Sequence, residues 1–476
     1  MQVIHSLFTD IYANYFATTA KNFDSDQFTL VGKWINIGWE SWYSECSPQI
    51  KLVEDFTKGK YPIENAIMKV WRVYHYSRIT DLWGPIPYSK FGNEKTSVPY
   101  DSQQDIYKDF FKTLSAATNV LNAHKDKTSA FGSNDIIYKG DVAKWLKFAN
   151  SLHLRLAMRI RYADKTMAKQ EAEKAVRPEN GGVMESNKDN AFVKTETFYK
   201  NPYNTITQWG EFRMSADMES ILKGYKDPRV QNYFDKAKPL DPEKNDDTTF
   251  IDRKDDPSGL EFDYEGFRNG QTKTEKAKKL NKYSDMAAPY RVNGGEGPSW
   301  PVMRFAEVNF LKAEGALMGW NMAGGTTEDF YNQGIKASLL EYGYEDKDLS
   351  GAQYTISTSL PLGFQSNNSN DAVSKVPVKF EGNDKEKKLE QIITQKWIAL
   401  FPNSEEAYAE RRRTGYPKLY DRAHSLNPDI PKDRIPRRLP YASSEKTNNK
   451  KAVDIAINKY LRGSDKGSTK LWWDQK

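Results

Sequence analysis

Apolar residues recur every three or four positions over residues 63–80, the spacing that places side chains on one face of an α-helix. The recurring positions are Ile63, Ile67, Val70, Trp71 and Tyr74. Pro62 precedes the pattern, where proline suits a first helical turn, and Gly84-Pro85 follows it as a stop signal. The pattern therefore predicts an amphipathic helix.

The same period marks several further segments. One begins at Ser102, whose hydroxyl can cap a helix together with Asp105, and continues to Leu121. Another begins at Asp141 as N-cap and continues to Ile160. Helical spacing also covers residues 303–318, a helix capped by Thr326 or Thr327, and residues 384–401 and 404–413. The sequence therefore predicts a mostly α protein.

Small residues alternate with large rings over residues 303–342. The small positions are Ala306, Ala313, Gly315, Ala316, Gly334 and Ala337. Small side chains let two helices approach closely, and close antiparallel pairs are the unit of tetratricopeptide (TPR) repeats. We expect a TPR-like scaffold, although the strict repeat consensus is not met.

The middle of the chain, about residues 183–300, is rich in Gly, Asn, Asp, Lys and Pro and has little apolar periodicity. Within it, residues 238–259 are expected to form a loop, and loops of that length are usually functional or mobile. Strand patterns are sparse. Residues 190–195 and 353–360 are the short candidates.

Composition supports a folded, weakly charged chain. Phe, Trp and Tyr make up 13% of the 476 residues, a share that disordered chains do not carry. The net charge of +6 is small for this length, and we expect no nucleic-acid partner. The single cysteine, Cys46, excludes an intramolecular disulfide. No segment approaches the roughly 18 apolar residues of a membrane span, so we expect a soluble chain.

The chain shows few signs of catalysis. The histidines at positions 5, 75, 124, 153 and 424 lack the spacing of metal ligands on one helix face, and we expect no metal or cofactor. Phosphate-loop, nucleophile-elbow and dinucleotide motifs are missing. Paired acids such as Glu405 and Glu406 could serve a glycosidase, but adjacent acids are usually solvated. No catalytic residue is assigned.

Aromatic residues gather in three segments, residues 23–43, 198–212 and 283–300. A flat ring beside Asn, Asp or Arg suits a sugar, which presents apolar faces flanked by hydroxyls. Trp42, Tyr43, Trp71, Trp145 and Trp397 are expected to face the core. The candidate ligand-binding residues are Asp24, Phe28, Trp34, Asn36, Trp39, Trp209, Tyr290, Arg291 and Trp300. We expect these tryptophans and Tyr290 to lie in irregular segments.

Eight short motifs occur in order along nearly the whole chain. They are residues 81–89 (DLWGPIPYS), 140–152 (GDVAKWLKFANSL), 226–229 (KDPR), 301–308 (PVMRFAEV), 395–401 (QKWIALF), 410–417 (ERRRTGYP), 435–441 (IPRRLPY) and 471–474 (LWWD). Together they resemble the SusD/RagB family of nutrient-binding outer-membrane lipoproteins, and its SusD-like branch in particular.

The resemblance implies one domain over residues 1–476. Four TPR-like helix pairs would occupy about residues 1–180 and 301–420, with a loop-rich insert at about 183–300 and a C-terminal segment at 421–476. It also implies a surface-exposed lipoprotein of the outer membrane. Cys46 lacks the small-residue context of a lipid acceptor, so we expect the signal peptide and the lipidated cysteine upstream of the given chain.

The family's task, carried over by resemblance, is to bind oligosaccharides without cleaving them and to deliver them to a SusC-like TonB-dependent transporter. In glycan-binding members the ligand lies against aromatics that correspond to residues 23–39 and 283–300 here. The alternatives are a peptide-binding member, a TPR-like interaction scaffold and, less favoured, a glycoside hydrolase. The residues Arg411 to Arg413 are expected to pair with carboxylates or helix C-termini.

Overall fold

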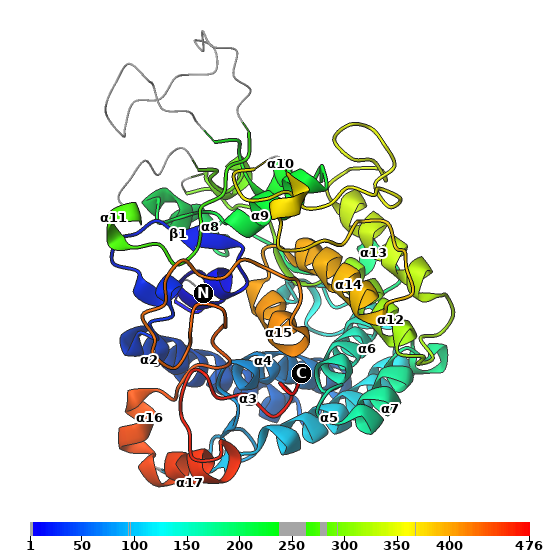
Figure 1. Ribbon diagram of the computed structural model, residues 1–476. Coiled ribbons are helices and arrows are strands. Elements are labelled where there is room, and N and C mark those ends of the chain that lie inside the picture. The colour runs from blue at the N-terminus through cyan, green and yellow to red at the C-terminus, as the bar shows by residue number, and fades with distance from the viewer. Residues whose placement is uncertain are drawn as a thin grey trace.

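Helices dominate the structure, and strands are short (Figure 1). The computed structural model describes residues 3–93, 95, 97–237, 263–276, 283–292, 294–366 and 368–476. The loop expected over residues 238–259 lies outside these described residues. The predicted mostly α class is confirmed.

The long helices pack side by side in pairs. The pairs are α4 (Pro62–Trp83) with α5 (Gln103–Ala123), α6 (Val142–Arg159) with α7 (Lys165–Ala175), α12 (Phe305–Leu317) with α13 (Thr327–Glu341), and α14 (Lys385–Leu400) with α15 (Ser404–Thr414). Helix α5 also packs on α6, and both α6 and α14 contact α12, so the pairs join into one stack. The predicted TPR-like scaffold is confirmed.

Shorter helices surround this stack. Near the N-terminus are the π-helix η1 (His5–Thr9), α1 (Asp10–Tyr12), the 3-10 helix η2 (Asp24–Gln27), α2 (Gly32–Glu40), the π-helix η3 (Ser41–Cys46) and α3 (Ser47–Thr57). The middle of the chain contributes α8 (Tyr203–Ile206), α9 (Ala216–Gly224), α10 (Val230–Tyr233) and α11 (Lys273–Lys276). Helices α16 (Ser443–Asn448) and α17 (Lys450–Tyr460) lie at the lower edge of Figure 1.

The strands of the described residues form three antiparallel two-stranded ladders. They are β1 (Phe16–Thr18) with β5 (Phe212–Met214), β2 (Ile86–Pro87) with β3 (Tyr100–Asp101), and β4 (Ala191–Val193) with β6 (Trp300–Met303). Strand β4 confirms the candidate at residues 190–195. The candidate at 353–360 is wrong, because that segment forms turns and irregular structure instead.

Side-chain caps set the starts of three scaffold helices. Ser102 accepts a hydrogen bond from the Asp105 amide, and Asp141 accepts one from the Lys144 amide. Thr326 caps α13 within a capping box. Each cap satisfies an amide that the first helical turn would otherwise leave without a partner. The caps expected at Ser102, Asp141 and Thr326 are therefore confirmed.

Close packing between α12 and α13 depends on a small residue. A Cβ atom added at Gly334 would lie 2.9 Å from the ring of Phe310. Only hydrogen fits at this position without displacing the ring, so the small residues at helical spacing mark the contact as the sequence predicts. The rings of Trp145 and Trp397 are buried as expected, and Trp71 is half-buried against the same core.

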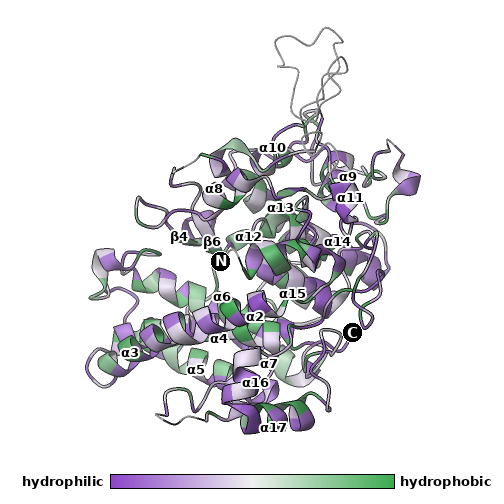
Figure 2. Cartoon of the chain, turned by 90° about the vertical axis from the view of Figure 1, so that its left-hand side faces the viewer, coloured by the Kyte–Doolittle hydropathy of each residue, from purple (hydrophilic) through white to green (hydrophobic). Residues whose placement is uncertain are grey.

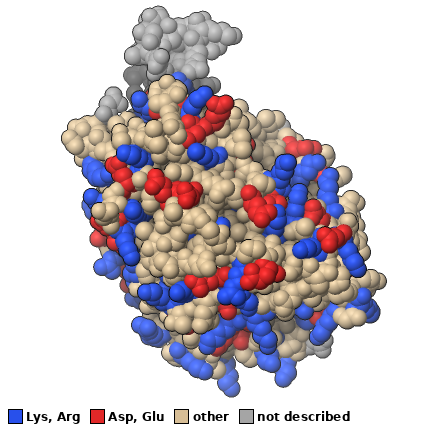
Figure 3. Space-filling view, turned by 90° about the vertical axis from the view of Figure 1, so that its right-hand side faces the viewer, with Lys and Arg blue, Asp and Glu red and all other residues tan. Residues whose placement is uncertain are grey.

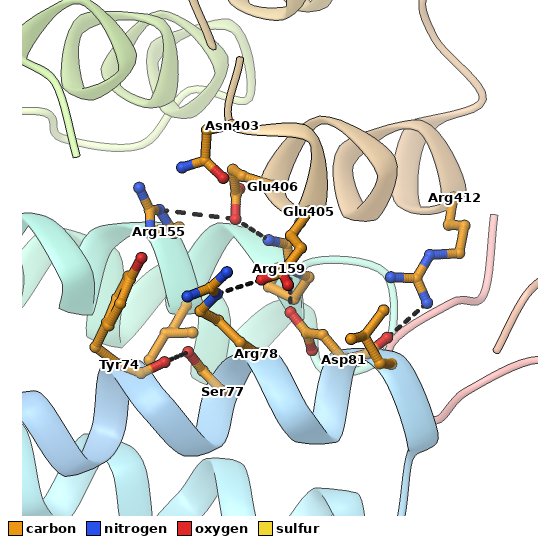
Figure 4. Close-up of a pocket in the computed structure, with 12 residues that line it drawn as sticks. Tyr74, Ser77, Arg78, Asp81, Arg155, Arg159, Asn403, Glu405, Glu406 and Arg412 are labelled. Carbon is orange, nitrogen blue, oxygen red and sulfur yellow. Dashed lines mark hydrogen bonds and ion pairs between the residues drawn. The ribbon is translucent and has the colours of Figure 1, made fainter. Parts of the chain in front are cut away.

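Buried charged side chains join α4, α6 and α15 (Figure 4). Arg159 contacts Asp81 at 3.1 Å, Glu406 at 2.5 Å and Glu410 at 2.6 Å. Glu405 and Glu406 are each only 7% exposed, so the expectation that these adjacent acids are solvated is wrong. Burial is tolerated because each carboxylate faces a guanidinium.

The three consecutive arginines of α15 have different partners. Arg413 contacts Glu314 and also pairs with Glu410 on its own helix. Arg412 donates to the main-chain oxygen of Asp81 near the C-terminal end of α4. These two arginines behave as expected. Arg411 also meets a helix C-terminus, because it donates to the Tyr12 carbonyl that ends α1, and its second acceptor is the neutral Asn14 side-chain oxygen.

The surface carries charges of both signs. Figure 3 shows Lys and Arg mixed with Asp and Glu over one face, with basic side chains most frequent towards its lower end. A mixed surface produces no strong long-range field of one sign. This agrees with the small net charge of +6.

Candidate functional site

A cleft of about 490 Å³ opens where the N-terminal segment meets η3 and β6. Figure 2 shows the N-terminus between β6 on one side and α4 on the other. The lining residues are Val3, Ile4, His5, Ile37, Gly38, Ser41, Trp42, Cys46, His75, Arg78, Trp300 and Glu405. Two of the aromatic regions that the sequence singles out, residues 23–43 and 283–300, therefore meet in one cleft.

Trp42 forms one wall of the cleft from the π-helix η3. Its ring stacks on His75, with the ring centres 5.1 Å apart and the planes at 24°. The guanidinium of Arg78 lies 5.4 Å from the Trp42 ring centre. The ring is half-buried, so it packs on α4 as the sequence predicts but also borders the cleft.

Trp300 also lines the cleft, from strand β6 and not from the irregular segment expected. It pairs with Val193 of β4, and this ladder holds the indole in place. The ring meets His5 edge-on at 5.2 Å and lies 5.9 Å from Tyr203. Trp300 is the predicted ligand-binding residue that lines the cleft directly.

The floor of the cleft is ionic. Arg78 pairs with Glu405, and His5 Nε2 lies 3.2 Å from the same carboxylate. Burial alone would raise the pKa of Glu405, but Arg78 and His5 outweigh burial and lower that pKa to about 2. Burial and Arg78 together lower the pKa of His75 to about 3. At neutral pH the floor therefore carries a carboxylate and a guanidinium beside a neutral His75.

The ionic floor is fixed by the buried charges behind it. Arg78 and Glu405 also border a small internal cavity together with Arg159 and Glu406, between α4, α6 and α15 (Figure 4). Arg159 and Glu406 form an ion pair of 2.5 Å, so the groups behind the floor have partners of their own. Polar groups supported in this way would need little rearrangement to contact a ligand.

Two predicted binding residues lie in the core instead. Phe28 is fully buried, with the Arg422 guanidinium 4.9 Å from its ring centre. Trp39 is 3% exposed and packs edge-on against Trp83. The expectation that Trp34 and Trp39 lie in an irregular segment is wrong, because both belong to helix α2.

Three predicted residues of the first aromatic region have other partners. Trp34 is half-buried and meets Phe23 edge-on at 5.4 Å. Asn36 exchanges two hydrogen bonds with Ser443 at the start of α16. Asp24 begins η2 and lies 3.9 Å from the Lys273 ammonium. The structure does not bring these side chains into the cleft lining.

Tyr290 and Arg291, from the third aromatic region, do not line the cleft. Tyr290 is buried, and its ring lies 6.1 Å from Tyr203, which in turn contacts Trp300. Arg291 pairs with Asp235. The expectation that Tyr290 lies in an irregular segment is wrong, since it ends a short 3-10 helix. Tyr290 thus braces the wall of the cleft from behind.

Trp209 belongs to a separate, exposed surface. It is 47% exposed at the end of a 3-10 helix, which again differs from the irregular segment expected. Phe198 is 92% exposed in the preceding loop, and Val292 projects from the neighbouring segment. A hydrogen bond of 2.7 Å from the Asn204 amide to the Gly295 oxygen joins the two segments. This surface lies outside the cleft lining.

The sequence analysis did not single out Arg78 or the cleft-facing side of Trp42, and it expected Glu405 to be solvated. Arg78 follows Tyr74 by four residues, so a charged residue on the apolar stripe of α4 was a usable signal. The change from α- to π-helix at Ser41 turns Trp42 relative to α2. No local residue pattern marks that change.

No group of three or more His, Cys, Asp or Glu within the described residues could hold a metal ion. Among the described helices, none combines the length and the apolar character needed to cross a bilayer.

Paired helices that frame a tryptophan-lined cleft define a TPR-like binding protein. The sequence model of the family described as SusD-like, "Susd and RagB outer membrane lipoprotein", matches residues 1–474. The chain therefore belongs to the SusD/RagB family, and its location is the outer membrane. Members of this family are binding proteins rather than enzymes.

Solved structures agree along the whole length. A chitin-binding SusD homologue from Flavobacterium johnsoniae is 35% identical with a TM-score of 0.87, covering 99% of this chain and 94% of that one. A SusD homologue from Bacteroides vulgatus is 30% identical with a TM-score of 0.86, covering 99% and 92%. A further chitin-binding protein is 28% identical with a TM-score of 0.79, covering 100% and 96%. No curated protein matches the chain.

Proposed function

We propose that this protein binds a neutral oligosaccharide in the cleft between Trp42 and Trp300 and does not cleave it. The proposal rests on one observation. Trp42 and Trp300, which are far apart in the sequence, line the same cleft, together with the ion pair of Arg78 and Glu405. The chitin-binding relatives support a glycan of the N-acetylglucosamine type as the first ligand to test.

The chemistry of the cleft suits a sugar. An indole can cover the apolar face of a sugar ring, while Arg78 and Glu405 offer donors and acceptors to its hydroxyls. Each stacked ring contributes on the order of 1 kcal/mol beyond the burial of area, so a few contacts give micromolar to millimolar affinity. Weak binding allows release to a transporter.

The transporter belongs to the same proposal. A SusC-like TonB-dependent transporter would receive the ligand, and a lipid anchor upstream of this chain would hold the protein at the cell surface. The family assignment supports a capture role. The ligand-binding roles of Asp24, Trp34, Asn36 and Arg291 stay predictions.

The test is calorimetric titration of chitin oligosaccharides, with other neutral oligosaccharides and oligopeptides as comparison ligands. We expect Trp42→Ala and Trp300→Ala each to weaken glycan binding roughly five- to tenfold. Phe198→Ala is the matched control, because this ring is exposed outside the cleft, and it should leave affinity unchanged.

Four outcomes would overturn the proposal in different ways. Unchanged affinity in both tryptophan variants, with a native circular dichroism spectrum, would place the site elsewhere. A response to peptides alone would make this a peptide-binding member. Release of reducing ends from a polysaccharide would make it a hydrolase. If no ligand bound while a transporter still copurified with the double variant, the protein would be an interaction scaffold.

A further inference from the structure

A second cleft, of about 500 Å³, opens where the end of α15 meets the loop around residues 429–437 and the C-terminal segment. It is separate from the tryptophan cleft, because the two share no lining residue. Its volume is in the range of small-molecule sites. The charged residues that line it are Arg411, Arg434, Arg437, Lys470, Asp429 and Asp433.

The charges of this cleft do not balance. Arg437 is already paired with Asp474, and Asp429 with Lys466 at 2.8 Å. Lys470 donates to a main-chain oxygen at 2.9 Å. In the described part of the chain no ion pair joins Arg411 or Arg434 to a carboxylate. Asp433 is therefore the acid left to face three cationic side chains.

Arg411 is the unusual member. Its two hydrogen bonds go to neutral oxygen atoms, the Tyr12 carbonyl at 3.1 Å and Asn14 Oδ1 at 3.0 Å. Arg422 donates to the same Asn14 oxygen at 2.7 Å, so two guanidiniums converge on one neutral acceptor. The Asn14 amide in turn donates to Asp217, whose charge acts on Arg411 from beyond the distance of an ion pair.

Arg413, on the same helix, has the carboxylate partners that Arg411 does not have. Arg413 is buried between two carboxylates, and they raise its pKa despite burial. Burial and the neighbouring Arg422 instead lower the pKa of Arg411 to about 10. Arg411 is half-buried and its hydrogen bonds go to neutral oxygen atoms, so its charge is only partly offset, and an anion arriving from solvent would lower that cost.

We propose that this cleft binds a small oxyanion, a carboxylate or a phosphate group, between Arg411 and Arg434. A guanidinium presents a planar fork of donors that matches two oxygens of either group. Lys470 adds a third positive charge at the rim. The site is independent of the glycan cleft, and the ligand would be a small acidic metabolite, the acidic end of a polymer or free phosphate.

The experiment is calorimetric titration at low ionic strength, where exposed charges are least screened, with inorganic phosphate in one arm and acetate and glucuronate in the other. We expect saturable binding with a dissociation constant of about 1 mM, the affinity of a few charge-assisted hydrogen bonds. Binding of phosphate alone would identify a phosphate site, and binding of the carboxylates alone a carboxylate site.

Two variants locate the site. Arg434→Gln removes an exposed guanidinium and should weaken binding about tenfold. Arg411→Gln should abolish saturation, with circular dichroism checking its fold. Lys451→Gln on α17 is the matched control, since it removes one exposed positive charge outside the cleft. Trp300→Ala should leave oxyanion binding intact, so failure of the glycan proposal would not affect this one.

The proposal is overturned if the unmodified protein shows no saturable binding of either oxyanion. It is also overturned if Lys451→Gln weakens binding as much as Arg434→Gln, because the effect would then report only net charge. Should Arg411→Gln fail to fold, the comparison of the Arg434 and Lys451 variants decides alone.

Discussion

The sharpest test of the ionic floor is the substitution Glu405→Gln. Glutamine keeps the shape of the side chain and removes its charge. The Glu405 carboxylate is 6% exposed, and it faces Arg78 and His5. The variant leaves Arg78 on the cleft floor without its carboxylate. We therefore expect lower stability together with a changed response to acid.

The magnitude follows from the pKa of Glu405. Its pKa falls from 4.5 in the unfolded chain to about 2 in the folded protein. A difference of this size corresponds to about 3 kcal/mol at neutral pH, in the range found when one member of a buried pair is removed. Because the folded pKa is lowered, this stability is fully present above about pH 4.5. It is lost as the pH falls through about 2.

The assay is urea unfolding followed by tryptophan fluorescence and circular dichroism at pH 7 and at successively lower pH. Glu40→Gln, an exposed glutamate of α2, is the matched control and should shift the midpoint little. The difference between unmodified protein and Glu405→Gln should shrink as the solution is acidified towards pH 2. A Glu405→Gln variant within about 1 kcal/mol of the unmodified protein at pH 7, or a difference independent of pH, would refute the reasoning.

Three further predictions concern positions around the clefts and the scaffold. The unmodified protein should lose stability as the pH falls from about 6.5 to 3, because the unfolded chain protonates His75 while the folded state holds its imidazole neutral. His75→Gln should remove this part of the loss. Melting temperatures that fall equally with pH in both proteins would contradict the prediction. Asn36→Ala should cost about 1–2 kcal/mol and speed amide exchange in α16, since both amide atoms pair with that helix; unchanged exchange rates would argue against this coupling. Gly334→Ala should destabilise by about 1–3 kcal/mol although alanine favours helices, because its Cβ would lie 2.9 Å from the Phe310 ring. Gly32→Ala, where the added methyl meets nothing within 4 Å, is the control, and equal melting temperatures for the two variants would disprove the clash.

Local signals predicted the scaffold well. The helix expected from residues 63–80 is α4 (Pro62–Trp83), and the caps at Ser102, Asp141 and Thr326 form as expected. These features depend on residues within one or two helical turns of each other, so a single segment contains all the information needed.

The exposure of the candidate residues was predicted less well, because exposure is not a local property. Trp39 and Trp42 are three residues apart in similar surroundings, yet the first is buried against Trp83 and the second borders a cleft. Phe28 has polar neighbours in the sequence, and this pattern favoured an exposed ring. In the structure the guanidinium of Arg422, which is distant in the sequence, covers that ring. The partner that decides exposure comes from another part of the chain in each case.

The sequence alone determined a helical chain of paired helices and its family resemblance. Periodicity, capping and ordered motifs encode these features within short segments. Only the tertiary structure decided that Trp42 and Trp300 line one cleft, that Glu405 and Glu406 are buried among guanidiniums, and that Arg411 donates to neutral oxygen atoms. Contacts between distant segments depend on how helices pack, and packing is a property of the whole chain.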